Sequence, residues 1–148
     1  MSLKKLALLF ACSSLGMTLI LAQTDGDEIS LFNSKGKPVA YIAEELTIYL
    51  WSGKPVGYLD EDSSGGFHVY GCNGKYLGWF VRGIIRDHQG HRVGGVKEVF
   101  LSSTQFEPFK SFKQFKPFKS FKEFAPFRPF FDNTWSDTSL RLFLFQGA

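Results

Sequence analysis

Apolar residues between positions 29 and 96 fall into four short runs that repeat one pattern around a glycine. The glycines that align the copies are Gly36, Gly53, Gly74 and Gly90. An aliphatic residue stands five positions before each glycine, at Leu31, Ile48, Val69 and Ile85. A small residue stands four positions after each glycine, at Ala40, Gly57, Gly78 and Gly94. A regular repeat of this kind indicates a fold assembled from equivalent units.

Each copy of the repeat predicts one β-hairpin. Ser52-Gly53 and Asn73-Gly74 are dipeptides typical of tight turns, because Gly and Asn tolerate a positive φ. A lone hairpin is marginally stable in water, so the four hairpins are expected to complete one another's sheets and cores. The constant small residue predicts a point at which two backbones approach closely. The spacing of the glycines leaves no room for a helix within residues 29–96.

Aromatic residues mark two further positions of the repeat. The residue after the aliphatic one is Phe32, Tyr49, Tyr70 and Arg86 in the four copies. The residue five positions after the glycine is Tyr41, Tyr58, Trp79 and Gly95. The fourth copy departs at both positions, so strict four-fold symmetry is not expected there.

Residues 104–131 follow a different period. Every third residue from Phe106 to Phe130 is phenylalanine, and basic residues keep the same spacing at Lys110, Lys113, Lys116, Lys119, Lys122 and Arg128. Pro108, Pro117 and Pro126 add a nine-residue superperiod. In an α-helix these phenylalanines would surround the axis and the prolines would break it. A polyproline II helix has three residues per turn, so we expect an extended tail with a phenylalanine ridge, a basic ridge and a mixed ridge.

Two interpretations of this tail remain open, because exposing a phenylalanine forgoes about 1.5–3 kcal/mol. In the first, the tail wraps the body as a girdle and its phenylalanines seal the hairpins. In the second, phenylalanine and basic side chains form a surface that inserts among anionic lipid headgroups or into a groove of a partner. A girdle whose basic ridge faced outward would combine the two.

Residues 1–22 have the layout of an export signal. Lys4 and Lys5 precede the apolar run from Leu6 to Ala22, and a polar, acidic segment follows. We expect cleavage after Ala22, with retention as an anchor or lipidation at Cys12 as alternatives. Cleavage would leave Cys72 as the only cysteine, so no intramolecular disulfide could form. The expected location is periplasmic or extracellular, with membrane association as a further expectation.

Two segments and the tail together resemble a known family. Residues 53–59 (GKPVGYL) and 70–80 (YGCNGKYLGWF), followed by the Phe-Lys-Pro tail, are similar to the bacterial four-fold β-flower family. The resemblance covers about residues 29–145 and implies an all-β, shallow, pseudo-four-fold barrel of four β-hairpin repeats with a Phe/Lys/Pro-rich extended tail. The expected organisation is a signal peptide at 1–22, a hairpin body at 23–103, the tail at 104–131 packed on or around the body, and a strand-like segment at 132–148. The resemblance implies no catalytic residues.

Candidate chemistry is sparse along the chain. The sequence lacks the common hydrolase, nucleotide-binding and paired-cysteine motifs, so we expect no catalytic residue and no cofactor. His88 and His91 flank one turn without a third ligand nearby in sequence, so no metal site is expected. Export and the competing need to bury phenylalanine argue against nucleic-acid binding by the tail. The candidate anionic-ligand site is a rim of turn residues, Lys37, Lys54, Lys75 and His91.

The sequence therefore predicts a non-enzymatic cell-envelope binding or structural module of unknown ligand. A membrane surface or an envelope protein is the expected partner, contacted through the six basic residues of the tail. The alternative is an uncharacterised exported hydrolase. Acidic, imidazole and hydroxyl side chains that converged in a cleft would favour that alternative.

Overall fold

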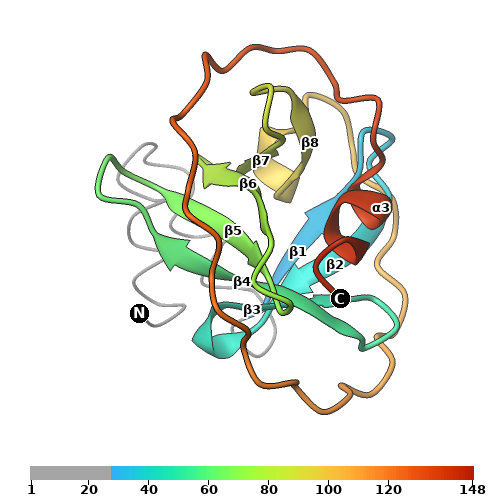
Figure 1. Cartoon of the computed structure of the whole chain (residues 1–148). Coiled ribbons are helices and arrows are strands. Elements are labelled where there is room, and N and C mark those ends of the chain that lie inside the picture. Colours follow the sequence, from blue (N-terminus) through green and yellow to red (C-terminus); the bar gives the residue numbers. More distant parts are fainter. Residues whose placement is uncertain (1–27) are drawn as a thin grey trace.

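The structure, a computed structural model, describes residues 28–148, so the predicted export signal lies outside the described residues. Eight antiparallel strands form a closed barrel in which each strand pairs with its neighbours in chain order (Figure 1). The strands are β1 (Ile29–Phe32), β2 (Pro38–Ile42), β3 (Thr47–Leu50), β4 (Pro55–Glu61), β5 (Phe67–Gly71), β6 (Tyr76–Val81), β7 (Ile84–Arg86) and β8 (Arg92–Gly95). Pairing of Phe32 in β1 with Gly95 in β8 closes the barrel. The predicted all-β fold is confirmed.

Four hairpins, β1–β2, β3–β4, β5–β6 and β7–β8, build the barrel. Within each hairpin the repeat aliphatic residue lies opposite the repeat small residue, as in Ile48 and Gly57 or Val69 and Gly78. The register shifts immediately after the aliphatic residue in all four hairpins. Such irregularities bend and twist a strand, which helps very short strands to close a barrel.

The small residue of the repeat lies where neighbouring hairpins meet. A Cβ atom on Gly78 would lie 1.9 Å from the carbonyl oxygen of Arg86, and one on Gly57 would lie 2.3 Å from that of Tyr70. Both carbonyls belong to the first strand of the next hairpin. The expected close approach of two backbones therefore occurs between hairpins.

The two faces of the barrel wall carry different side chains, because successive residues of a strand point to opposite sides. The repeat aliphatic residues are fully buried in the interior. The repeat aromatic residues other than Phe32, which packs against Phe100, lie on the outer face in two clusters. One cluster contains Tyr41, Ala43 and Tyr49, and the other contains Tyr58, Tyr70, Tyr76 and Trp79.

A short helix, α3 (Leu140–Phe145), completes the core, so the predicted strand-like segment at 132–148 is wrong. Leu140, Phe143 and Leu144 are buried, and their spacing places them on one face of a helix. Phe143 reaches Gly78 in β6, and α3 also contacts β2, β4 and β8. The second strands of all four hairpins therefore meet this helix.

Two 3₁₀ turns, η2 (Glu44–Leu46) and η3 (Lys97–Val99), join the elements. The first is a single turn between two hairpins in which Glu45 and Leu46 adopt a positive φ, outside the right-handed helical region, so it is not a regular helix. Within residues 28–148, no helix has the length and apolar character needed to cross a bilayer.

Candidate functional site: the wrapped tail

The tail, residues 104–131, runs around the barrel and crosses the turn of each hairpin in succession (Figure 1). At every crossing a backbone N–H of the tail, or at the fourth crossing that of the residue directly after it, donates a hydrogen bond to the carbonyl oxygen of the repeat glycine. The pairs are Gln105 with Gly36, Gln114 with Gly53, Glu123 with Gly74 and Asp132 with Gly90, at N···O distances of 2.8, 2.9, 2.9 and 3.3 Å. The donors lie nine residues apart, so one superperiod of the tail spans one hairpin.

Along the mixed ridge of the tail, which starts at Gln105 and continues with every third residue, pairs of backbone donors are separated by prolines. Ser111 N–H donates to the carbonyl of Trp51 at 3.2 Å, so the second hairpin receives one bond from Ser111 and one from Gln114. The third hairpin receives an equivalent pair from residues nine positions later. The prolines of the superperiod fall between the crossings, where no N–H is used and a fixed φ favours an extended chain. The four-fold barrel therefore explains the nine-residue superperiod.

The basic ridge faces the aromatic outer surface of the barrel. Tyrosines of adjacent hairpins stack there in two pairs, Tyr41 with Tyr49 and Tyr58 with Tyr70. Lys110 Nζ lies 4.7 Å from the ring centroid of Tyr41, and Lys119 Nζ lies 4.0 Å from that of Tyr58. Such cation–π contacts contribute about 0.5–1 kcal/mol each at exposed sites. Burial, with a smaller effect of Glu28, raises the pKa of Tyr41 to about 12, so its ring stays neutral.

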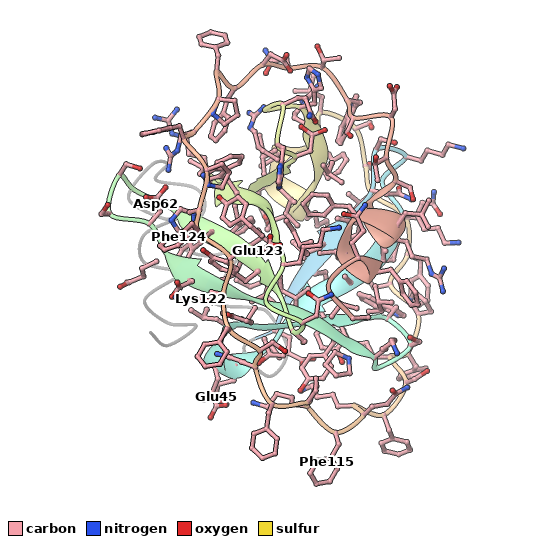
Figure 2. The ribbon with its side chains drawn as sticks, in the orientation of Figure 1. Glu45, Asp62, Phe115, Lys122, Glu123 and Phe124 are labelled. Carbon is pink, nitrogen blue, oxygen red and sulfur yellow. The ribbon has the colours of Figure 1, made fainter. Side chains whose placement is uncertain are left out.

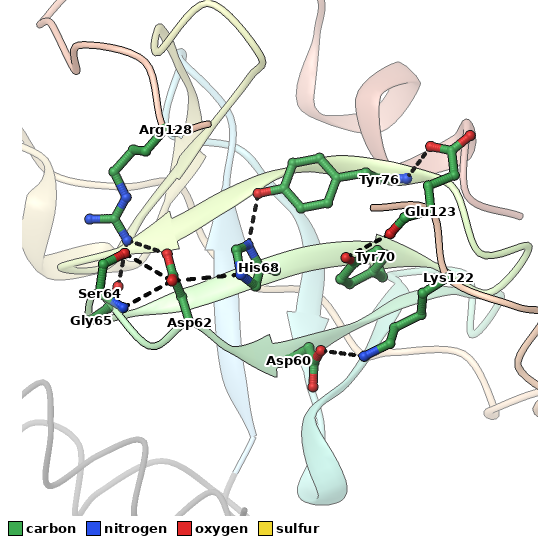
Figure 3. A network of polar contacts seen from close by, with 10 residues as sticks. All are labelled: Asp60, Asp62, Ser64, Gly65, His68, Tyr70, Tyr76, Lys122, Glu123 and Arg128. Carbon is green, nitrogen blue, oxygen red and sulfur yellow. Dashed lines mark hydrogen bonds and ion pairs between the residues drawn. The ribbon is translucent and has the colours of Figure 1, made fainter. Parts of the chain in front are cut away.

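Carboxylates at the edge of the barrel bind the same ridge. Glu28, which precedes β1, contacts Lys110 and Lys113 at N···O distances of 3.1 and 2.6 Å. Burial acts to raise the pKa of Glu28, but hydrogen bonds from Lys113 and Lys110 outweigh it and lower that pKa. The other ion pairs are Lys116 with Glu45, Lys122 with Asp60 and Arg128 with Asp62 (Figures 2 and 3). All six basic residues of the predicted membrane surface therefore contact the barrel.

Between the third and fourth hairpins the arrangement is reversed, so that the cation belongs to the barrel and the aromatic ring belongs to the tail. Arg86 replaces the repeat tyrosine in the barrel wall, and Phe131 lies nine residues after Lys122 on the basic side of the tail. The Arg86 guanidinium lies 4.8 Å from the Phe131 ring centroid. Arg86 also donates hydrogen bonds to the carbonyl oxygens of Gly90 and Asp132. The tail thus compensates for the departure of the fourth copy.

The nine phenylalanines of the ridge, every third residue from Phe106 to Phe130, point away from the barrel. Their exposed fractions range from 88% at Phe106 to 104% at Phe109. Figure 2 shows Phe115 extending outward from the tail. The predicted wrapping of the tail as a girdle is confirmed, but the expectation that its phenylalanines seal the hairpins is wrong, because the basic ridge faces the barrel instead. The outer face of the barrel presents tyrosine rings and carboxylates, which attract cations, while its aliphatic side chains face the interior.

The predicted cationic rim stays a prediction. Its members, Lys37, Lys54, Lys75 and His91, occupy equivalent turns of the four hairpins. Lys54 Nζ lies 5.7 Å from the ring centroid of Phe145 in α3. His91 Nδ1 lies 2.9 Å from Asp132 Oδ2, and this hydrogen bond raises the pKa of His91 and lowers that of Asp132.

A polar network that the sequence did not reveal joins β5, β6 and the loop after β4 to the tail (Figure 3). His68 Nδ1 lies 2.9 Å from the Tyr76 hydroxyl, and His68 Nε2 lies 3.7 Å from Asp62 Oδ1. Asp62 accepts hydrogen bonds from Ser64 and from Arg128 of the tail. Burial strongly raises the pKa of Tyr76, so its hydroxyl stays protonated. Nothing in the strand pattern around His68 distinguishes it from an ordinary strand residue.

Metal and thiol chemistry find no support within residues 28–148. That part of the chain holds no group of three or more side chains able to bind a metal ion together. Cys72 is a buried free thiol, and burial raises its pKa. A raised pKa disfavours the thiolate, which is the reactive form of cysteine.

Comparison with known proteins gives one family. The family model described as "4-fold beta flower protein" matches residues 29–144, which comprise the barrel, the tail and most of α3. No curated protein and no solved structure matches the chain.

Proposed function

The chain belongs to the 4-fold beta flower family, and from that premise we propose that it is a non-enzymatic, exported module that binds the lipid surface of a membrane in the cell envelope through its phenylalanine ridge. The observation that carries the proposal is the full exposure of nine phenylalanines on a tail whose basic side chains all contact the barrel. Monomeric soluble proteins rarely expose apolar surface on this scale, and large exposed patches mark interaction sites.

The surface of a lipid bilayer fits the arrangement of these rings. The phenylalanines stand on an extended chain without a groove of their own, so each ring can enter the boundary between headgroups and acyl chains separately. Each ring that leaves water gains about 1.5–3 kcal/mol. The predicted export signal directs the chain toward the envelope, where such an interface is available.

The role expected for the basic residues changes with this geometry. Their charges are used in contacts to Glu28, Glu45, Asp60 and Asp62 and to the tyrosine rings. Anionic lipid should therefore add little to binding, and uncharged phosphatidylcholine should suffice. This expectation separates ring insertion from adsorption by charge.

Sedimentation with vesicles tests the proposal. A chain without residues 1–22 should sediment with phosphatidylcholine vesicles at high salt, and changing all nine ridge phenylalanines, every third residue from Phe106 to Phe130, to Ser should lower the bound fraction at least ten-fold. The matched control, the same nine positions changed to Leu, should retain most of the binding. Melting temperatures should be equal in all three proteins, because these rings are exposed. A parent chain that fails to bind either neutral or anionic vesicles contradicts the proposal.

The alternative function, an exported hydrolase, rests on the polar network of Asp62, His68 and Tyr76. In this network a carboxylate contacts an imidazole, and the imidazole contacts a hydroxyl. Enzymes use this arrangement to activate a hydroxyl nucleophile. The network favours a structural role instead, because Tyr76 is 2% exposed and its raised pKa disfavours the phenolate. Ester hydrolysis that is lost in His68→Gln with an unchanged melting temperature would support the alternative.

A further inference from the structure

We propose that the membrane meets one particular arc of the phenylalanine ridge, the arc beside Glu28, for as long as residues 1–27 remain attached to the barrel. This arc, called the proximal arc, consists of Phe106, Phe109, Phe112 and Phe115. The inference rests on the proposed function and names the part of the surface that performs it.

The shape of the tail makes a choice between arcs necessary. The tail encircles the barrel, so its phenylalanines point outward in different directions around the molecule (Figures 1 and 2). A flat bilayer can contact one side of such a ring at a time. All nine rings therefore cannot enter one planar interface together.

The position of Glu28 determines which arc is nearest to residues 1–27. It is the first described residue, and both of its carboxylate oxygens contact tail lysines, Oε1 with Lys110 and Oε2 with Lys113. Phe109 and Phe112 immediately precede these lysines and are 104% and 98% exposed. The point at which residues 1–27 join the barrel therefore lies against the proximal arc.

The length of the connection excludes the far side of the ring. An apolar run retained in the bilayer would end at Ala22, and the five residues 23–27 span at most about 18 Å when fully extended. A folded body of this size is about 35 Å across. Phe124 and Phe127 come more than one nine-residue superperiod after Lys113, so they lie beyond the next hairpin around the barrel. Docking through them would draw Glu28 away from the bilayer, which the short connection opposes.

Single Phe→Trp substitutions can report which arc contacts lipid. Phe109→Trp and Phe124→Trp are a matched pair, because both positions are fully exposed members of the same ridge. Each variant is reconstituted as the full chain with vesicles of brominated phosphatidylcholine, which quenches tryptophan near the acyl chains. The parent protein, with Trp51, Trp79 and Trp135, gives the background to subtract.

In the full chain we expect the added fluorescence of Phe109→Trp to be quenched at least three-fold more than that of Phe124→Trp. Without residues 1–22 we expect this difference to disappear, because no connection then selects an arc. Equal quenching in the full chain, or stronger quenching at position 124, would overturn the inference. A chain without residues 1–22 that binds no vesicle would instead overturn the proposed function.

Discussion

At the scale of single residues, the turn glycines decide how closely the tail approaches the barrel. Gly53 and Gly74 adopt φ values of +88° and +86°. A Cβ atom on either would lie 2.0 Å from a carbonyl oxygen of the tail, that of Phe112 or Phe121. Gly36 has a similar φ of +73°, but a Cβ atom there would meet the tail no closer than 3.5 Å. The tail therefore occupies the space that a side chain would need at the second and third turns.

We expect Gly53→Ala to lower the melting temperature more than Gly36→Ala. Both variants place alanine in the left-handed region, which costs about 1–2 kcal/mol. Gly53→Ala in addition displaces the tail backbone and its hydrogen bond from Gln114. Differential scanning calorimetry measures the two losses, and equal losses would show that the tail does not press on the second turn.

At the scale of elements, α3 acts as part of the barrel core. Leu144 and Leu142 belong to the same helical turn, but Leu144 is fully buried and Leu142 is 59% exposed. Leu144→Ala should lower the free energy of unfolding by about 2–5 kcal/mol, because it leaves a cavity in the core. Leu142→Ala should change it by less than about 0.5 kcal/mol. Urea denaturation separates these values, and similar effects would mean that α3 contributes little to the core.

The elements that the sequence predicted well are those set by local pattern. The hairpins follow from turn glycines and from the pairing of residues close in the chain, such as Ile48 with Gly57. The three-residue period of the tail likewise requires an extended chain. The short helix was missed because the apolar run at residues 142–145 is too brief to distinguish a helix from a strand.

The orientation of the tail depended on contacts that no local pattern contains. Tyr41 and Tyr49 come from different hairpins, and their stacking under Lys110 and Lys113 becomes visible when the register is known. One signal was present in the sequence. Phe131 departs from the phenylalanine series and occupies the phase of the basic ridge, as Arg86 departs from the aromatic positions of the barrel. Together they indicated that basic and aromatic residues face each other.

At the scale of the whole molecule, many weak contacts hold the tail to the barrel. Exposed ion pairs contribute about 0–1 kcal/mol each, so no single one secures the tail. We expect Lys110→Gln, Lys119→Gln and Lys122→Gln combined to release the tail while the barrel stays folded. Chymotrypsin cleavage after the tail phenylalanines should accelerate at least five-fold, because cleavage requires a locally detached chain.

A matched control for this variant is Lys35→Gln, Lys37→Gln and Lys97→Gln, which removes the same charge from exposed body positions. Cleavage by chymotrypsin should remain at the parent rate in the control, and circular dichroism should show the same β-sheet content in all proteins. Equal acceleration in both variants would mean that net charge, rather than the contacts of the basic ridge, governs the tail.

The buried helix at the end of the chain also determines the order in which the protein can fold. The contacts of α3 with β2 join residues about a hundred positions apart, and contacts of such separation form slowly. Until they form, the aliphatic interior lacks the side chains of Leu140, Phe143 and Leu144. The tail lies between β8 and α3 in the chain. When α3 packs on the barrel, both ends of the tail are therefore held. A nascent chain from which α3 has not yet emerged therefore has neither a finished barrel nor a closed loop around it.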